Sequence, residues 1–365
     1  MDSKQLRQAA CNARRVVVKI GSRALADQPD APQRLASSIA TLSTDKRSFV
    51  VVSSGAIALG GKRLGYRGRP SEMSRLQAAA AVGQSILMHR YEDGFAGTDL
   101  VAAQVLLTHA DLASRVRLNN ARQALGALLE ARAIPIINEN DTVSTEEINF
   151  GDNDQLAAMV VPLVGAELLV LLTDVPGVLD AQGHRIAVLT DPALRADLKS
   201  AESGIGSGGM DSKLDAAYKA SRSGAGVVIA SAAEPQVLER ILAGEDVGTW
   251  CPATGPLLRA RKHWIAFTLR PSGTLILDAG AVHAVETGSR SVLAVGVLGV
   301  RGQFNAGDAV RLVGTDGVEV GRGLARLGAL DVARIAGKRN QELACLYGSE
   351  CSDGVVVHKD DLVRS

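Results

Sequence analysis

Short runs of Val, Ile and Leu recur through residues 1–250 and alternate with longer stretches in which apolar positions repeat at helical spacing. The runs are continuous in their apolar character, which is typical of strands buried on both faces of a parallel sheet. We predict strands at 16–20, 49–53, 101–107, 134–137, 168–172 and 226–230, and helices between them at 33–42, 74–91, 116–131, 154–164, 211–223 and 235–242. Strand alternating with helix predicts an α/β fold with a doubly wound, mostly parallel sheet.

The pattern changes after Thr249, where two prolines and a group of basic residues precede short apolar runs separated by glycines. We predict strands there at 273–277, 292–297, 309–313 and 318–324, with a hairpin turn at 314–317. A chain of 365 residues also exceeds the size at which one hydrophobic core usually stops growing. We therefore expect a larger domain at 1–255, a linker at 256–271 and a small β-rich domain at 272–365.

The charge of the chain is balanced, with 40 Lys and Arg against 39 Asp and Glu and a formal net charge of +1. This balance creates no global field that would recruit nucleic acid or an anionic membrane, so we expect a small-molecule partner. The N-terminus is charged where a signal peptide needs an apolar stretch, and Pro162 and Glu167 interrupt the most hydrophobic region, 156–172. We expect a soluble, cytoplasmic protein.

The four cysteines are scattered and form no CxxC pair. This distribution suits a reducing compartment, so we expect Cys11, Cys251, Cys345 and Cys351 to be free thiols. The six histidines are also scattered, and the sequence contains no HExxH pair of metal ligands. We therefore assign the histidines structural roles.

The segment 136–154 is the densest polar stretch of the chain. It carries six carboxylates, those of Glu139, Asp141, Glu146, Glu147, Asp152 and Asp154, with four asparagines among them. Crowded carboxylates repel each other unless a cation, a substrate ammonium group or a lysine lies between them. A solvated acidic loop is the alternative interpretation. A buried-type strand leads directly into this segment, and ligands of open α/β sheets bind beyond the carboxyl ends of strands, so we predict the mouth of an active site.

Three further strand ends carry polar residues. Lys19 lies inside an apolar strand just before Gly21, a costly position unless an anion meets the ammonium group or the side chain reaches solvent from an edge strand. Ser54 and Gly55 follow the next strand, where a helix start would offer backbone N–H groups to an anion; a plain capping serine is the alternative. Asp174 ends a third strand and could face a ribose, a lysine or a metal, or cap a helix.

The glycine cluster at 204–209 formally matches GxGxxG, but the preceding residues are polar and helix-like instead of forming a strand. We therefore reject a dinucleotide-binding fingerprint, and no GxxxxGK[ST] sequence indicates a P-loop. A glycine-rich linker would explain the glycines. It would not explain Lys213, which lies in the first turn of the following helix, where it can bring a point charge to a phosphoryl group. Together, these clusters predict phosphoryl transfer without a P-loop.

In this order the clusters resemble the amino acid kinase family over nearly the whole chain. The matching segments are KIGS at 19–22, SSGAIALG at 53–60, INEND at 137–141, GDND at 151–154, LLTDVPGV at 171–178 and GSGGMDSK at 206–213. INEND followed by GDND, together with a C-terminal segment similar to a PUA domain at about 272–347, is typical of family members that act on glutamate. Members that act on acetylglutamate, uridylate or aspartate lack that combination.

The resemblance implies ATP-dependent phosphorylation of the γ-carboxylate of L-glutamate to L-glutamyl 5-phosphate, the first step of proline biosynthesis. It implies that Lys19 and Lys213 stabilise the transferring phosphoryl group and that Asp154 holds both lysines. The implied glutamate-binding residues are Ser54, Gly55, Asp141, Asp152 and Asn153, with Asp141 meeting the substrate ammonium group. The residues implied to surround ATP are Lys19, Thr173, Asp174, Ser207, Gly208, Gly209, Met210, Asp211, Ser212 and Lys213. Mg²⁺ would be held mainly through the nucleotide phosphates, so we predict no protein ligand for a metal.

The family further implies a homo-oligomer and proline as a candidate feedback inhibitor. Two features depart from the family: Arg23 stands where relatives carry a small hydroxyl residue, and the nucleotide-side loop at 180–186 is shorter than usual. The alternatives are another activity of the family, on acetylglutamate or a similar carboxylate, and RNA binding or modification through the C-terminal segment. Residues 271–365 carry ten Lys and Arg against eleven Asp and Glu, whereas an RNA-binding face should be basic. Nucleic acid is therefore not an expected partner.

Overall fold

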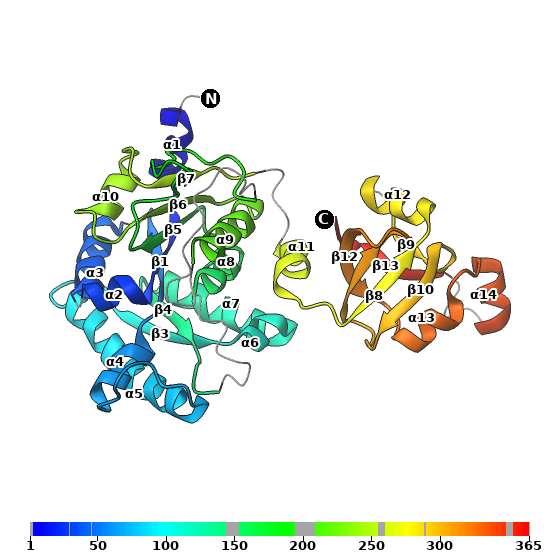
Figure 1. Cartoon of the computed structure of the whole chain (residues 1–365), viewed down its shortest axis with the longest axis horizontal. Coiled ribbons are helices and arrows are strands. Elements are labelled where there is room, and N and C mark those ends of the chain that lie inside the picture. The colour runs from blue at the N-terminus through cyan, green and yellow to red at the C-terminus, as the bar shows by residue number, and fades with distance from the viewer. Residues whose placement is uncertain are drawn as a thin grey trace. The chain divides into compact units, whose positions relative to one another are not determined.

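The computed structural model of the chain describes residues 3–28, 30–44, 46–143, 153–193, 209–254, 260–287, 290–347 and 353–364. The chain divides into two compact units, residues 1–257 and 258–365 (Figure 1). Each unit has its own buried apolar cluster, as expected for a chain longer than one core can serve. The domain and linker boundaries predicted at 255 and 272 stay predictions.

A seven-stranded sheet forms the centre of the first unit, in the order β3-β4-β2-β1-β5-β6-β7. Its strands are β1 (Arg15–Ile20), β2 (Ser48–Ser53), β3 (Ala102–Leu107), β4 (Ile134–Glu139), β5 (Leu168–Thr173), β6 (Gly226–Ser231) and β7 (Thr249–Cys251). The first six strands are parallel, and β7 pairs antiparallel with β6 at the edge. The predicted doubly wound, mostly parallel sheet is confirmed. The three-residue strand β7 was not predicted, because so short a run gives no pattern.

Helices cover both faces of this sheet (Figure 1). One buried cluster joins Leu35, Leu87 and Leu238 from α3, α5 and α10, and the other joins Leu125, Val160 and Leu214 from α7, α8 and α9. The helices are α1 (Ser3–Asn12), α2 (Ser22–Asp27), α3 (Ala31–Leu42), α4 (Ala56–Arg63), α5 (Met73–Phe95), α6 (His109–Ala113), α7 (Arg115–Glu130), α8 (Asn153–Val164), α9 (Met210–Arg222) and α10 (Val237–Leu242).

The parallel register brings the polar strand ends to one edge of the sheet. Ile20 at the end of β1 pairs with Ser53 of β2 and with Leu172 of β5, and Glu139 ends β4 two strands away from β1. Residues that follow these strands therefore share one edge, although they are far apart in sequence.

Helices α4 and α5 approach each other closely at two glycines. A Cβ atom added to Gly60 would lie 1.8 Å from the carbonyl oxygen of Ala79, and one added to Gly83 would lie 1.7 Å from that of Ala56. Only glycine fits at such backbone contacts. The contact fixes α4, which begins directly after the polar end of β2.

The second unit contains a six-stranded sheet in the order β10-β8-β11-β12-β13-β9, which confirms the predicted small β-rich module. Its strands are β8 (Gly273–Leu277), β9 (Val292–Leu293), β10 (Val297–Gly302), β11 (Ala309–Val313), β12 (Glu319–Ala325) and β13 (Val355–Arg364), with short helices α11 (Ala260–His263), α12 (Ala279–Thr287), α13 (Ala329–Ile335) and α14 (Asn340–Tyr347). The single strand predicted at 292–297 is wrong in part, because a 3₁₀ turn at Ala294–Gly296 separates β9 from β10. The predicted hairpin turn is present: Gly314 N–H donates to Val318 O at 3.0 Å.

Two smaller expectations can be compared with the described residues. Cys11 and Cys251 are free thiols, whereas the side chains of Cys345 and Cys351 lie outside the described part of the chain. No helix among the described residues combines the length and the apolar character needed to cross a membrane.

Candidate active site

Two lysines and one aspartate from three different elements meet at the carboxyl edge of the sheet. Lys19 near the end of β1 forms an ion pair with Asp154 Oδ1, and Lys213 Nζ lies 3.1 Å from Asp154 Oδ2. The Asp154 side chain is fully buried, and the two lysine side chains are only 4% and 7% exposed. The residue pattern predicted an anion near each lysine, and the family resemblance implied Asp154; the structure brings that one carboxylate to both lysines.

The charges of this cluster sum to one net positive charge. Burying ions is costly unless they are paired, and Asp154 offsets part of that cost for both lysines. Two ammonium groups held close together repel each other, so the cluster attracts a further anion. Polyanionic oxygens, such as those of a phosphoryl group, have the charge that such a cluster favours.

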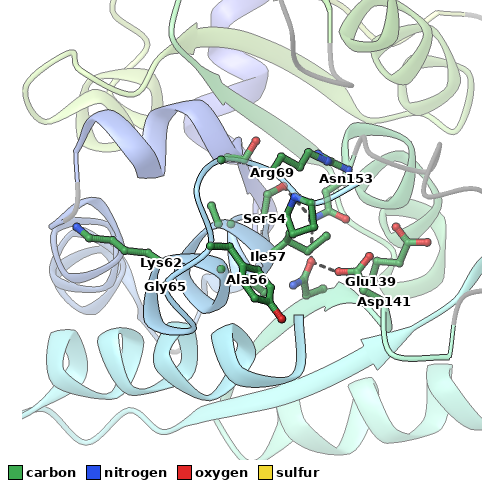
Figure 2. Close-up of a pocket in the computed structure, with 17 residues that line it drawn as sticks. Ser54, Ala56, Ile57, Lys62, Gly65, Arg69, Glu139, Asp141 and Asn153 are labelled. Atoms are coloured by element: carbon green, nitrogen blue, oxygen red, sulfur yellow. Dashed lines mark hydrogen bonds between the residues drawn. The ribbon is translucent and has the colours of Figure 1, made fainter. Parts of the chain in front are cut away.

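A cavity of about 520 Å³ opens beside the ends of β2 and β4 (Figure 2). Its wall combines the start of α4, the loop between α4 and α5, the end of β4 and the start of α8. The polar residues that line it are Ser22, Ser54, Lys62, Tyr66, Arg69, Asn138, Glu139, Asp141 and Asn153. Asn153 lies next to Asp154 in sequence, so the cavity and the lysine cluster share the first turn of α8.

Asn153 connects three segments at the inner wall of the cavity. Its side-chain amide donates to Ser53 O at 2.9 Å, to Ser54 Oγ at 2.9 Å and to Asn138 Oδ1 at 2.8 Å. The amide of Asn138 in turn donates to Gln84 Oε1 at 2.8 Å, in the core-facing part of α5. Buried amides with several partners are rigid, so this network fixes the spacing between β2, β4 and α8.

The residue that caps the start of α4 needs to be glycine. Gly55 has φ of +97°, and a Cβ atom there would also lie 3.0 Å from a methyl carbon of Leu25. Residues other than glycine rarely adopt this conformation. The turn leaves the first N–H groups of α4 at the cavity wall, where unpaired helix N–H groups can bind an anion.

Asp141 is buried in the turn after β4 and lines the cavity. Burial raises the pKa of the Asp141 carboxyl to about 6, and the positive charge of Arg69 partly offsets the rise. A carboxylate in this state gains from any cation that enters the cavity, because a cation removes part of the cost of burying the charge.

The end of β5 contributes Thr173 and Asp174. Thr173 Oγ1 donates to Asp174 Oδ1 at 2.9 Å, and a guanidinium nitrogen of Arg23 lies 3.5 Å from Asp174 Oδ2. Burial tends to raise the pKa of Asp174, but the hydrogen bond from Thr173 and the charge of Arg23 outweigh it and lower the pKa. Arg23 thus forms an exposed ion pair that joins α2 to the end of β5. The segment after β5 forms a small turn in which Leu179 pairs with Arg185.

The structure describes most but not all of the residues predicted for the site. Asp152, Ser207, Gly208, Glu146 and Glu147 lie outside the described residues. Gly209 precedes α9, and Met210, Asp211 and Ser212 form its first turn, next to Lys213. Their contacts with a nucleotide stay a prediction.

Several cavity residues received no role from the sequence. Glu139 and Asn138 lie in the polar segment 136–154 that was predicted as the mouth of the site, but neither was assigned a contact. Arg69 lies in an irregular loop between α4 and α5, where the sequence gives no periodic signal. Only the fold brings that loop to the cavity.

Comparison with known proteins places the two units in known families. Residues 14–231 match the amino acid kinase family, and residues 273–345 match the PUA domain. The chain is 45% identical over 366 residues to the glutamate 5-kinase of Methylobacillus flagellatus, with 96% of this chain and 98% of that protein covered. It is 46% identical to the glutamate 5-kinase of Myxococcus xanthus, with 98% and 97% covered.

A solved structure shares the fold at much lower identity. The N-acetylglutamate synthase from Neisseria gonorrhoeae, complexed with coenzyme A and N-acetyl-glutamate, superposes with a TM-score of 0.50 at 17% identity. The match covers 70% of this chain and 63% of that one. At this identity the likeness concerns the fold alone.

Proposed function

The chain belongs to the amino acid kinase family, and from that premise we propose that it transfers the γ-phosphoryl group of ATP to the γ-carboxylate of L-glutamate, forming L-glutamyl 5-phosphate. This reaction is the first step of proline biosynthesis. The observation that carries the proposal is the shared first turn of α8: Asn153 lines the cavity, and Asp154 holds the two lysines. An acceptor bound in the cavity therefore lies next to the charges that a phosphoryl donor needs.

The chemistry requires no general base, because the γ-carboxylate of glutamate is already ionised at neutral pH. A carboxylate oxygen attacks the γ-phosphorus in line, a new carboxylate–phosphorus bond forms, and the bond to the β–γ bridging oxygen of ATP breaks to release ADP. Catalysis then consists of positioning the reactants and neutralising charge on the phosphoryl oxygens. Lys19 and Lys213 supply that charge, and Asp154 keeps both ammonium groups at the edge of the sheet.

We assign the phosphoryl acceptor, glutamate, to the cavity. We assign the phosphoryl donor, ATP, to the part of the site formed by the end of β5 and the start of α9. Ser54, Gly55 and Asn153 form the inner wall that faces the reacting carboxylate, and Asp141 receives the substrate ammonium group. Thr173, Asp174 and the first turn of α9 surround ATP. The buried lysine pair fits a triphosphate, because two ammonium groups share one carboxylate there.

Mg²⁺ bound with ATP would supply part of the charge neutralisation on the phosphates, and it would be held mainly through those phosphates. Within the described part of the chain, no three His, Cys, Asp or Glu side chains are grouped so that they could hold a metal ion. We also retain as proposals a cytoplasmic location, a homo-oligomeric assembly and inhibition by proline.

A coupled assay that detects ADP formation tests the proposed function. The full chain is offered ATP and Mg²⁺ with L-glutamate, N-acetyl-L-glutamate, L-aspartate or uridylate in parallel. We expect turnover with glutamate at least about a hundredfold above the other acceptors, since a buried polar site rejects ligands that leave its groups unpaired. Equal or greater turnover with N-acetyl-L-glutamate would contradict the proposal, because acetylation removes the ammonium group assigned to Asp141.

A further inference from the structure

The outer part of the cavity contains charges of both signs that the phosphoryl chemistry does not use. Glu139 and Asp141 are buried at the end of β4, and Arg69 comes from the loop between α4 and α5. In Figure 2, Lys62 points away from the other labelled side chains, whereas Arg69 points inward, in the direction of Asn153. Of these two cations, Arg69 is therefore the one that faces the cavity.

The acidic and basic groups of this part of the cavity act on each other. The charge of Arg69 lowers the pKa of Asp141 against the larger effect of burial, so the guanidinium group lies within electrostatic range of the carboxylate. Arg69 acts on Asp141 through its charge and not through a direct hydrogen bond, and Arg69 is exposed. A ligand that carries a negative and a positive group close together could pair with both Arg69 and Asp141, which do not pair directly with each other.

We infer that Arg69 binds the α-carboxylate of the substrate, so that Arg69 and Asp141 together recognise the zwitterionic head group of an α-amino acid. This inference rests on the proposed function, because it takes the acceptor to be an amino acid whose side-chain carboxylate reaches the lysine cluster. The guanidinium group offers the paired donors that a carboxylate accepts. An α-carboxylate and an α-ammonium group sit on one carbon atom, which matches two opposite charges that line one cavity.

The loop that carries Arg69 has features that place this side chain. Gly65 and Gly68 adopt φ of +75° and +85°, a left-handed conformation that favours glycine. Arg75 at the start of α5 stacks 5.9 Å from the ring centroid of Tyr66, another cavity residue. The two glycine turns and this contact direct the loop back over the cavity, so that Arg69 is presented to it.

The test compares two acceptors that differ only at the α-carboxylate. L-isoglutamine is the α-amide of glutamate: it keeps the γ-carboxylate and the ammonium group but lacks the charge assigned to Arg69. We expect the wild-type protein to prefer glutamate over isoglutamine by about ten- to a hundredfold in kcat/KM, since hydrogen bonds to charged groups contribute on that scale. In Arg69→Gln the preference should fall to a few-fold, mainly through a higher KM for glutamate and with kcat nearly retained.

Two further variants make the result specific. Arg69→Lys keeps the charge but loses the paired donors, so its preference should be intermediate. Arg67→Gln removes a cation from the same loop that does not line the cavity, and it should keep the wild-type preference. A second readout is the acid limb of the kcat/KM profile for glutamate, which should move to higher pH in Arg69→Gln because Arg69 lowers the pKa of Asp141.

The possible failures can be told apart. If the wild-type protein does not phosphorylate glutamate, the proposed function is wrong and this inference goes with it. If the wild-type protein does so and Arg69→Gln keeps both the KM for glutamate and the full preference over isoglutamine, the assignment of Arg69 is wrong while the proposed function stands. An equal loss of the preference for glutamate over isoglutamine in Arg67→Gln and Arg69→Gln would also overturn the assignment. The preference would then depend on the total positive charge of the loop and not on a contact made by Arg69.

Discussion

The two ends of the candidate site differ in how their charges are satisfied. At the lysine end, Asp154 contacts both Lys19 and Lys213, so the reacting charges are assembled before any ligand binds. At the cavity end, Asp141 is buried, with its pKa raised to about 6. The lysine end pairs its buried charges within the protein, whereas the cavity end keeps a cost of burying charge that an entering cation would lower. In the proposed function, catalysis would use the preorganised pairs and substrate recognition would use the buried carboxylate.

Asp154→Asn should have the largest effect, because it leaves two buried lysines without their shared carboxylate. We expect kcat to fall by roughly a hundred- to a thousandfold and the free energy of unfolding to fall by about 3–5 kcal/mol. Steady-state kinetics and thermal unfolding would measure both. Asp215→Asn, an exposed change on α9, is the matched control. A variant with wild-type turnover would show that Asp154 does not hold the lysines for catalysis.

Lys213→Met should lower kcat by roughly a hundredfold or more, since removing one preorganised charge costs on the order of 3 kcal/mol at the transition state. The KM for ATP should change much less, because Lys19 and the nucleotide contacts remain. Lys219→Met is the control for helix stability. Lys219 lies on α9, like Lys213, and its ammonium group donates a hydrogen bond to Gln155 Oε1 of α8 at 2.5 Å. Near-normal turnover in a folded Lys213→Met protein would remove this residue from the mechanism.

Asp141→Asn tests the cavity end through binding. It keeps the shape of the side chain and removes the charge assigned to the substrate ammonium group. The KM for glutamate should rise by about ten- to a hundredfold while the KM for ATP stays nearly constant. Inhibition by proline, if it uses the same pocket, should weaken in parallel. A higher KM for ATP with an unchanged KM for glutamate would contradict the assignment of Asp141 to the glutamate side of the site.

The effect of Asp141→Asn on the free energy of unfolding should depend on pH. Because the folded-state pKa of Asp141 is raised, its ionisation destabilises the fold: the cost is absent below about pH 4, grows as the pH rises through about 6, and is complete above that. Asp141→Asn should therefore stabilise the ligand-free protein by up to about 3 kcal/mol at pH 8 and by little at pH 4. Thermal unfolding across pH would measure this. A destabilised variant at pH 8 would contradict the raised pKa.

Removal of the second unit should have the smallest effect on the chemistry. A chain ending near Ala253 keeps β7 and all described residues assigned to the site, since the two compact units divide at 257. We expect kcat for glutamate within a few-fold of the full chain, because no phosphate-handling residue lies beyond the cut. Kinetics of the purified fragment, with circular dichroism to confirm folding, would test this. A folded but inactive fragment would show that the PUA-like unit contributes to the site.

The sequence determined much of the sheet and of its polar edge. Continuous apolar runs located six of the seven strands of the first unit, because strands buried on both faces admit few polar residues. Lys19 and Lys213 were also singled out by their local sequence. Lys19 places a charge inside an apolar strand, and Lys213 follows a glycine cluster that a simple linker would explain without a lysine. The resemblance to a family then named Asp141 and Asn153. Local patterns are informative where burial constrains every residue.

Other features depend on contacts between distant segments. Helix α1 was not predicted, because its sequence is polar; its Arg7 is buried and donates to the carbonyl oxygens of Ala187 and Val247, which no local pattern reveals. The amide network of Asn153 and the position of Arg69 likewise required the tertiary structure, whereas the family resemblance already implied that Asp154 holds Lys19 and Lys213. An ion pair or a cavity wall is a property of side chains brought together by the fold, and the sequence order of those side chains does not record their distances.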